Sequence, residues 1–406
     1  MLRDRFNLPD DTIYLCGNSL GPQPRAGAAA LEREVDSWRR RGVEGWWRGD
    51  GPEGGWLGYH RRVQNELADI VGARPEEVTV ANALTVNLHL LMVSFFRPEG
   101  TRRKIIMEAG AFPSDQHAVI SQLEFHGLEP KECLVEVAPR SGELTLRTED
   151  ITVAIAELGE ELALVLWTGV HYYTGQFFDL EAIAQAGHAA GAVVGFDLAH
   201  AAGNVPLRLH DWGADFAAWC SYKYLNGGPG APGGLFVHER HAADESLPRF
   251  AGWWGHRERD RFLMRRSFRP ERGAAGWQVS TVPVLGLAPL VGGLPLFTEA
   301  GGMEALRRRS LELTGRLYDL LAAIPGLTVI TPADPAARGA QLSVYVPGAR
   351  PDLEEELSAA GLVVDYRQDN LLGSDGGILR LAPAPLYTTM AEVDAVAAII
   401  RRVLSG

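Results

Sequence analysis

The stretch VVGFDLAHAAGNVPLRLHDWGADFAAWCSYKYLNGGPGAPGG, residues 193–234, decides the fold of this chain. Its first apolar run predicts a buried strand over 192–196 that leads into Asp197, and a second run over 215–220 ends shortly before Lys223. The two charged residues are 223 − 197 = 26 positions apart, which leaves room for a crossover and one more strand. Ligands of open α/β sheets bind at the carboxyl ends of the strands. The candidate ligand-binding residues at or near such ends are Glu108, Thr168, Asp197 and Lys223.

A carboxylate and a lysine at two strand ends are what a pyridoxal phosphate site requires. The lysine holds the cofactor aldehyde as a Schiff base, and the carboxylate pairs with the pyridinium nitrogen. His200 follows three residues after Asp197, and the glycine-rich run 227–234 after Lys223 lets the backbone approach a ligand closely. Taken singly, these residues are more often a surface lysine, a helix N-cap and a structural histidine. Together they favour a pyridoxal phosphate site.

Seven blocks of this sequence resemble the kynureninase family, whose members are pyridoxal phosphate enzymes of the aspartate aminotransferase fold type I. The longest, residues 195–230, is similar to the cofactor segment of that family. The others are YLCGNSLGP (14–22), ANALTVNLHLLM (81–92), FPSDQHA (112–118), GVHYYTGQ (169–176), GWWGH (252–256) and RLAPAPLY (380–387). The blocks occur in family order, so the resemblance covers essentially the whole chain.

Alternating strand and helix patterns after residue 59 predict an α/β fold with a mainly parallel sheet covered on both faces. The seven strands expected in this sheet are 77–81, 104–108, 134–138, 163–168, 192–196, 215–220 and 234–238. The expected helices are 25–41, 59–71, 85–96, 114–125, 148–158 and 180–190. No GxGxxG motif follows the first strand, so a nicotinamide dinucleotide enzyme is poorly supported.

A Pro- and Gly-rich segment, 283–295, marks the expected change from a large domain to a smaller one. Beyond it we expect helices at 299–323, 352–360 and 391–404 and strands at 327–330, 342–346, 363–366 and 378–381. We therefore expect an N-terminal arm and helix (1–50) that packs with the small domain, a large cofactor-binding domain (51–295) and a small C-terminal α/β domain (296–406).

Composition, cysteine count and the N-terminal residues exclude several classes of protein and site. The formal net charge is 39 − 51 = −12, which argues against a general nucleic-acid binder, and the arginine run 257–272 is read as a solvated or interface face. Cys16, Cys133 and Cys220 form neither a disulfide framework nor a zinc pattern, and we expect no metal. The first residues lack the apolar core of a signal peptide, and no long uncharged apolar stretch is present, so a cytoplasmic location is expected.

The resemblance assigns three catalytic residues: Lys223 for the Schiff base, Asp197 for the pyridine nitrogen, and Tyr222 near the phosphate and the reacting carbon. Phe112 matches the ring that stacks on the cofactor, and Thr85 opens a helix whose amides suit the phosphate. The full implied cofactor-binding set is Leu84, Thr85, Phe112, Pro113, Ser114, Asp115, Thr168, Asp197, His200, Tyr222, Lys223, Trp253 and Thr281.

Two members of that set, Trp253 and Thr281, match positions that reach the cofactor from the neighbouring subunit, so a homodimer with its active site at the subunit interface is implied. Arg380 resembles the arginine that binds the substrate α-carboxylate, a task that suits its planar fork of donors. Trp56 and Asn18 complete the expected substrate-binding residues.

The implied reaction is the hydrolytic cleavage of the Cβ–Cγ bond of L-kynurenine to anthranilate and L-alanine, and of 3-hydroxykynurenine to 3-hydroxyanthranilate. Such a reaction serves tryptophan catabolism or the supply of NAD precursors. Family members that favour the 3-hydroxy substrate carry a His/Asn pair near its ring. Here Thr281 stands at the Asn position, and Trp56 is our candidate for the His position. A buried hydroxyl left without partners costs about 1–3 kcal/mol, so we expect a preference for kynurenine.

Two alternatives remain open from the sequence. Another reaction of the same cofactor, such as cysteine desulfuration or transamination, is the nearer one, but desulfuration needs a mobile nucleophilic cysteine. Cys220 is expected in a strand and Cys16 in the arm. A non-catalytic regulator that binds pyridoxal phosphate is the second, although the enzyme-like blocks leave no room for an appended DNA-binding domain. Anthranilate fluorescence on addition of kynurenine distinguishes all three.

Overall fold

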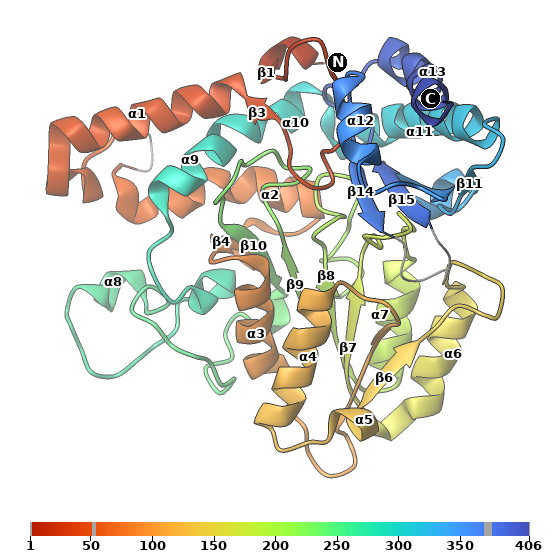
Figure 1. The fold of residues 1–406 in the computed structure, drawn as a ribbon. Coiled ribbons are helices and arrows are strands. Elements are labelled where there is room, and N and C mark those ends of the chain that lie inside the picture. Colours follow the sequence, from red (N-terminus) through yellow and green to blue (C-terminus); the bar gives the residue numbers. More distant parts are fainter. Residues whose placement is uncertain (1, 51–53, 369–375, 406) are drawn as a thin grey trace.

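The computed structural model describes residues 2–50, 54–368 and 376–405, and its largest sheet has seven strands in the order β4-β10-β9-β8-β7-β5-β6 (Figure 1). Strand β10 runs antiparallel to both neighbours, while the other neighbouring pairs are parallel. The prediction of a mainly parallel seven-stranded sheet is confirmed. The strands are β4 (Val78–Ala81), β5 (Lys104–Glu108), β6 (Leu134–Val137), β7 (Leu162–Thr168), β8 (Val193–Asp197), β9 (Phe216–Trp219) and β10 (Gly233–Val237).

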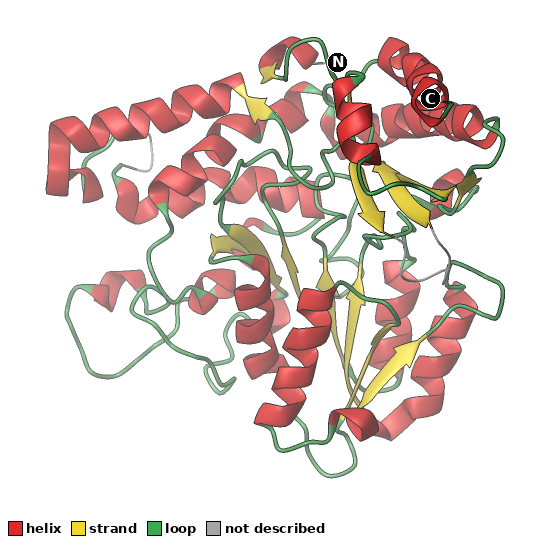
Figure 2. Cartoon of the chain, in the orientation of Figure 1, coloured by secondary structure: helices red, strands yellow, loops and turns green. Residues whose placement is uncertain are grey.

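Helices cover both faces of this sheet (Figure 2). Alternate residues of a strand point to opposite faces, so Leu164 and Leu166 of β7 join one core, and Val165 and Trp167 join the other. The first core is completed by α3 (Leu84–Phe95) and α4 (Pro113–Phe125), and the second by α2 (Gln64–Val71), α6 (Thr148–Leu158) and α7 (Leu180–Ala189). Burial on both faces explains why these strands are continuous apolar runs.

The C-terminal part forms a four-stranded antiparallel sheet in the order β11-β12-β15-β14. Leu379 and Leu381 of β15 pack under the helices that cover one face. Ile378 contacts Tyr173 of the large sheet's loops, so the other face, which also carries Arg380, meets the large sheet. The strands are β11 (Thr328–Val329), β12 (Leu342–Pro347), β14 (Asp365–Gln368) and β15 (Gly376–Leu381), and the helices are α11 (Gly302–Ala322), α12 (Leu353–Ala359) and α13 (Met390–Leu404).

The N-terminal arm joins both parts of the molecule. Strand β2 (Ile13–Tyr14) pairs in parallel with β13 (Leu362–Val363), and Leu15 enters the core of the small sheet. Strand β1 (Phe6–Asn7) pairs with β3 (Gln23–Pro24), which leads into α1 (Arg25–Arg41). The three-part domain division stays a prediction, and residues 51–53, where its first boundary falls, lie outside the described residues.

The helices of the structure differ from the prediction in three places. Residues 283–295, expected as a break, form α9 (Val284–Gly293), which tolerates Pro289 because it packs against α1 at Gly27. The expected helix 59–71 begins as a 3-10 helix, η3 (Trp56–Val63), before α2. The buried Trp56 and Tyr59 share its three-residue spacing. The expected helix 299–323 is divided into α10 (Pro295–Glu299) and α11, because Gly301 adopts a φ of +91° between them.

The remaining helical elements are short. They are α5 (Pro130–Cys133), α8 (Glu258–Arg261), η1 (Arg3–Arg5), η2 (Gly42–Trp46), η4 (Pro75–Glu77), η5 (Gly159–Glu161), η6 (Glu239–His241), η7 (Gly273–Trp277) and η8 (Pro335–Ala337). Among the described helices, none is by itself both long and apolar enough to cross a membrane. One pair bent by 77°, Val284–Glu299 with Gly302–Ala322, meets the length and composition criteria jointly.

Candidate active site

Three parallel strands end in polar residues at one edge of the large sheet: β5 in Glu108, β7 in Thr168 and β8 in Asp197. Thr168 lies directly beside Asp197 in the sheet register, and its backbone N–H donates to Glu108 Oε2 at 3.4 Å. Asp197 Oδ1 accepts from the backbone of Ala199 at 2.7 Å, which fixes the carboxylate. Asp115, in the first turn of α4, reaches Asp197 with its side chain, so three buried carboxyl groups meet here.

Two of the three carboxyl groups have raised pKa values. Burial raises the pKa of Glu108 to about 8, and the nearby Asp197 adds to the rise. Burial also holds the pKa of Asp115 well above its usual range, again with a contribution from Asp197. Near neutral pH, Glu108 and Asp115 therefore favour their protonated forms.

Lys223 lies opposite this group and is buried, with its Nζ 2.9 Å from Nε2 of His200. Burial, reinforced by the neighbouring ammonium group, holds the pKa of His200 well below its usual range. The imidazole is therefore neutral and accepts a hydrogen bond from Lys223. The rings of Phe112 and Tyr222 each have their centroid 5.9 Å from Nζ, so the amine lies in a largely apolar enclosure.

Two helix N-termini converge beside the lysine. Helix α3 begins at Leu84 and α4 at Pro113, and their first polar side chains meet, with Thr85 Oγ1 at 2.5 Å from Ser114 Oγ. The first amides of each helix have no partner within the helix and carry the positive end of its dipole. This pair of helix ends has the chemistry of a phosphate site.

The residues fit pyridoxal phosphate. Three buried polar atoms around Lys223 have no partner within the described chain: Ser221 Oγ, His200 Nδ1 and Asp115 Oδ1. Phe112, just before α4, leaves 45% of its surface exposed, and its ring contacts Tyr172 edge-on at 5.1 Å. An exposed ring face, a buried amine, a lone carboxylate and a phosphate cradle match the four parts of the cofactor.

Two residues expected to bind the substrate, Arg380 and Asn18, come from the small sheet and the arm. Arg380 Nη1 donates to the Tyr172 carbonyl at 2.9 Å, which places the guanidinium against the active-site loop. Asn18 is fully buried and donates to Gln341 at 3.1 Å, while its Oδ1 has no partner among the described residues.

The arm approaches Lys223 closely at one point. Gly21 N donates to the carbonyl of Tyr222 at 2.8 Å, and a Cβ on Gly21 would lie 2.3 Å from the carbonyl oxygen of Lys223. A glycine is therefore required for the arm to close over the lysine loop.

Three predicted site residues lie apart from this group. Trp56 is buried with its Nε1 bonded to Glu34 at 2.8 Å, and it lines a surface groove together with Thr281. Trp253 is half-exposed and donates to the carbonyl of Arg261 at 3.0 Å. None of the contacts described for these residues reaches Lys223, and their roles stay predictions.

Sequence reasoning placed Glu108 among the strand-end residues but gave it no role, and it left out Tyr172, Gln341 and Asp365. Tyr172 lies in the quoted GVHYYTGQ block. Asp365 follows the apolar run 362–364, and a single acidic residue in such a strand pattern indicates a buried side chain that needs a partner. Gln341, whose amide donates to the Tyr172 carbonyl at 2.8 Å, has no comparable local pattern.

The cysteines do not provide a mobile nucleophile in the described structure. Cys133 and Cys220 are buried, Cys16 is partly buried, and all three are free thiols. Burial raises the pKa of Cys16 to about 12, and it also raises that of Cys220. A thiol that stays protonated is a weak nucleophile, so desulfuration chemistry is disfavoured.

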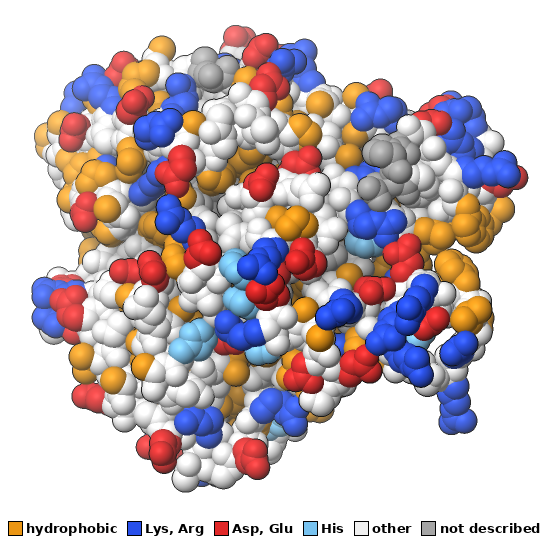
Figure 3. All heavy atoms as spheres, turned by 180° about the vertical axis from the view of Figure 1, so that it is seen from behind, with side chains coloured by type: hydrophobic (Ala, Val, Ile, Leu, Met, Phe, Trp, Pro, Cys, Tyr) orange, Lys and Arg blue, Asp and Glu red, His pale blue; other side chains and the backbone are white. Residues whose placement is uncertain are grey.

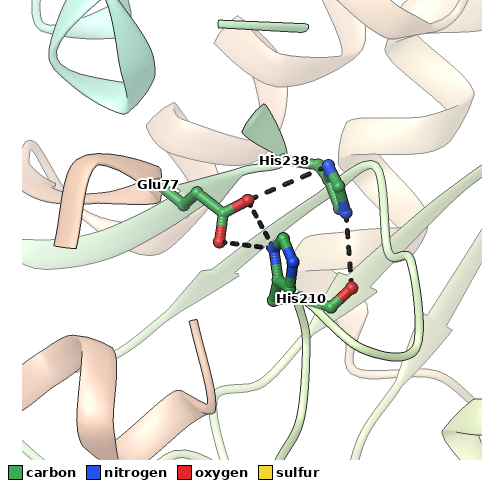
Figure 4. A group of neighbouring side chains, drawn as sticks. All are labelled: Glu77, His210 and His238. Atoms are coloured by element: carbon green, nitrogen blue, oxygen red, sulfur yellow. Dashed lines mark hydrogen bonds and ion pairs between the residues drawn. The ribbon is translucent and has the colours of Figure 1, made fainter. Parts of the chain in front are cut away.

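A second group of titratable side chains lies away from the site, where Glu77, His210 and His238 meet (Figure 4). Their residue types can bind a metal. However, His210 Nδ1 already lies 2.9 and 3.1 Å from the two Glu77 oxygens, while His238 Nδ1 accepts from Arg240 N and its Nε2 lies 3.3 Å from the His210 carbonyl. The group therefore has a structural role, because its hydrogen bonds connect η4, the β8–β9 connection and the end of β10. The absence of a metal stays a prediction.

Comparison with known families gives two matches. A model described as the kynureninase C-terminal domain matches residues 306–400, and one described as the DegT/DnrJ/EryC1/StrS aminotransferase family matches residues 43–209. The kynureninase of Stenotrophomonas maltophilia (strain K279a) is 52% identical over 97% of this chain and 92% of the relative. That of Myxococcus xanthus (strain DK1622) is 52% identical over 96% and 91%.

Solved structures with a similar fold are more distant in sequence. The apo cysteine desulfurase of Thermococcus onnurineus NA1 has a TM-score of 0.82 and 18% identity, covering 100% of this chain and 98% of that one. A variant of C-DES, with glycine covalently linked to its PLP cofactor, has a TM-score of 0.82 and 17% identity, covering 99% and 98%. At such identities the likeness shows the fold alone, which is that of PLP-dependent enzymes of fold type I.

Proposed function

The chain belongs to the kynureninase family, and we propose that it hydrolyses the Cβ–Cγ bond of L-kynurenine to give anthranilate and L-alanine. It is a pyridoxal phosphate enzyme acting on a carbon–carbon bond next to a ketone. The observation that carries the assignment to particular residues is the pairing of buried Lys223 with neutral His200 at the strand ends that also carry Asp197.

Each part of the site would hold one part of the cofactor. Lys223 would bind the aldehyde carbon, Asp197 would pair with the pyridine nitrogen, and Phe112 would stack on the ring. The phosphate would lie at the N-termini of α3 and α4, with Thr85 and Ser114 as hydroxyl donors. The other residues of this shell are Leu84, Pro113, Asp115, Thr168, His200 and Tyr222.

Pyridoxal phosphate, when bound, supplies a pyridinium ring that draws electrons from the substrate and makes cleavage of the Cβ–Cγ bond feasible. Asp197 keeps the proton on the ring nitrogen by placing a negative charge beside it. Lys223 Nζ is placed to take the proton from the substrate α-carbon. His200, which accepts a hydrogen bond from Nζ, orients the amine for that transfer.

The remaining groups bind the substrate and protonate the product. Burial raises the pKa of the Tyr222 phenol above its usual range, so it holds its proton at neutral pH and can deliver it to the alanine carbon. Arg380 would bind the α-carboxylate, and Asn18 offers a buried amide oxygen that has no partner in the described chain. Water is the second reactant, and its oxygen ends in the carboxylate of anthranilate.

We propose that the active unit is a homodimer. Large hydrophobic side chains gather where the far end of α1 meets the loop that contains α8, at the right-hand edge of Figure 3. Trp47 contacts Phe262 at 6.4 Å, and Phe262 contacts Trp253 at 5.4 Å, so these exposed rings form one patch. Soluble monomers rarely expose such a surface. A second copy that covers it would bring Trp253 and Thr281 to the neighbouring active site.

The finer assignments are part of the same proposal. We place the enzyme in the cytoplasm, which the three free cysteines support, and in tryptophan catabolism or the supply of NAD precursors. The turnover of 3-hydroxykynurenine to 3-hydroxyanthranilate is proposed as the slower reaction. The division into 1–50, 51–295 and 296–406 is proposed on the two separate sheets and their cores.

The test is a fluorescence assay for anthranilate with the purified enzyme, pyridoxal phosphate and L-kynurenine. L-Cysteine with sulfide detection provides the comparison with desulfuration. We expect anthranilate from the wild type, none from Lys223→Ala, and no sulfide from either. Sulfide release without anthranilate would replace the proposal by desulfuration, and cofactor binding without either product would favour a regulator.

A further inference from the structure

We infer that Asp365 is a positioning residue that fixes the carboxylate-binding edge of Arg380. The inference rests on the proposed role of Arg380 in binding the substrate α-carboxylate. Asp365 itself would not touch the substrate, because its contacts are with two arginines of the same sheet.

The two residues are brought together by sheet register. Asp365 in β14 and Arg380 in β15 are directly opposite in the antiparallel ladder, so both side chains project from the same face of the small sheet. This is the face that meets the large sheet, because Arg380 contacts Tyr172 from it. Both side chains are almost fully buried, with exposed fractions of 9% and 4%. A buried ionic pair with this geometry constrains the guanidinium strongly.

The hydrogen bonds of Arg380 leave one edge available. Asp365 Oδ1 accepts from Nε at 2.9 Å and from Nη2 at 2.7 Å, and the carbonyl of Tyr172 accepts from Nη1 at 2.9 Å. A guanidinium has five N–H groups, so 5 − 3 = 2 remain, one on each Nη. Donors on the two Nη atoms can bind a carboxylate end-on. Within the described residues, neither of the two remaining N–H groups has another partner.

Charge balance supports the same role. A lone Asp365 would neutralise Arg380 and weaken its hold on an anion. Arg367 offsets this, because its Nε lies 3.0 Å from Asp365 Oδ1 and its Nη2 3.1 Å from Oδ2. The three residues carry a formal net charge of +1. Glu354, whose carboxyl group interacts with all three, reduces this charge, and burial raises the pKa of Glu354. Arg367 therefore keeps the pair of Asp365 and Arg380 attractive to the substrate carboxylate while the orientation of Arg380 is fixed.

The arrangement also couples substrate binding to the cofactor side. Arg380 and Gln341 both donate to the carbonyl of Tyr172, at 2.9 and 2.8 Å. The ring of Tyr172 packs edge-on against Phe112, which we propose as the stacking ring. A guanidinium released from Asp365 would therefore lose its place relative to both the carboxylate and this loop.

The experiment compares Asp365→Asn and Asp365→Glu with the wild type, using Asp394→Asn as the matched control. Asp394 forms an exposed ion pair with Arg316 in the same part of the molecule, far from Arg380 in its contacts. The measurements are kcat and KM for kynurenine, the inhibition constant of L-alanine, which carries the α-carboxylate, and that of 2-aminoacetophenone, which lacks it. Thermal unfolding of each variant is followed in parallel.

We expect Asp365→Asn to raise KM and the L-alanine inhibition constant about tenfold or more, with kcat within about threefold and 2-aminoacetophenone inhibition unchanged. Asp365→Glu should recover part of the loss, and Asp394→Asn should match the wild type. Unchanged KM and L-alanine inhibition would overturn the inference, and so would equal weakening of both inhibitors, which marks a general structural role. A wild type without anthranilate production would instead refute the proposed function.

Discussion

Replacing Asp197 by Asn tests whether Asp115 can take over as the negatively charged carboxyl group of the site. Burial is the main cause of the raised pKa values of Asp115 and Glu108, and the nearby Asp197 is a further cause of both. Asn at position 197 removes the ionisable group but leaves the shape and the bond from Ala199 N largely intact. The pKa of Asp115 should then fall, because one of the causes that raised it has gone.

The expected fall in kcat follows from the hydrogen bond that is lost. A hydrogen bond to a charged group contributes about 1.5–3 kcal/mol, so losing the ionised partner of the pyridine nitrogen should lower kcat by about 10- to 150-fold. Because the pKa of Asp115 should fall in Asp197→Asn, we expect Asp115 to take over part of that role. Asp115→Asn alone should cost about twofold or less, because it replaces a protonated acid by a neutral amide of similar shape.

The double variant tests whether Asp115 takes over the role of Asp197. Asp197→Asn with Asp115→Asn should be slower than the product of the two single effects, by about tenfold, because no carboxylate remains to take over. The assay is kcat for kynurenine by anthranilate fluorescence, with bound cofactor quantified by its visible absorbance. A double variant equal to Asp197→Asn would show that Asp115 never takes over, and a wild-type rate in Asp197→Asn would show that another group pairs with the ring nitrogen.

Further predictions address the lysine, the ring preference, the dimer and the pH dependence of stability. Lys223→Ala and Lys223→Arg should both lose turnover and the visible absorbance of the lysine-bound cofactor, since a guanidinium forms no Schiff base; multiple turnovers by either would refute the assignment. The wild type should have a higher kcat/KM for kynurenine than for 3-hydroxykynurenine. Thr281→Asn should shift the ratio of these two kcat/KM values toward 3-hydroxykynurenine by about 5- to 150-fold. Thr281→Val should leave the ratio unchanged. Trp253→Ala should weaken the dimer seen by sedimentation and lower activity together, and a fully active monomer would contradict the shared site. Burial opposes ionisation of Asp215, but hydrogen bonds from His188, His241 and Arg240 outweigh it and hold its pKa well below its usual range. Asp215→Asn should therefore lower the free energy of unfolding by about 1.5–3 kcal/mol at neutral pH. The difference in unfolding free energy from wild type should shrink as the pH falls below about 4. A pH-independent difference in urea titrations would exclude the ionic explanation.

The large sheet and the residues at its strand ends were predictable from local patterns. Apolar runs followed by Asp197 and Lys223 placed both residues at one edge, and the structure brings them to the same site. Asp365 was missed because its role depends on sheet register with Arg380, which no local pattern encodes. The helix α9 was missed because its Pro and Gly content favours a break, and packing against α1 overrides that preference. Trp253 was predicted from family resemblance alone, and its role in the site stays a prediction.

The pairing of β2 with β13 has a consequence for how the enzyme is made. Ile13 and Leu362 are adjacent in the ladder but 362 − 13 = 349 positions apart, so the arm leaves the ribosome long before its partner strand exists. Contacts of such long range carry a high loop-closure cost and form late. The large sheet can assemble first, whereas the arm can take its final place beside β13 only after residues 362–363 have been synthesised. We therefore expect a bulky N-terminal fusion to delay the gain of activity more than the gain of folded sheet.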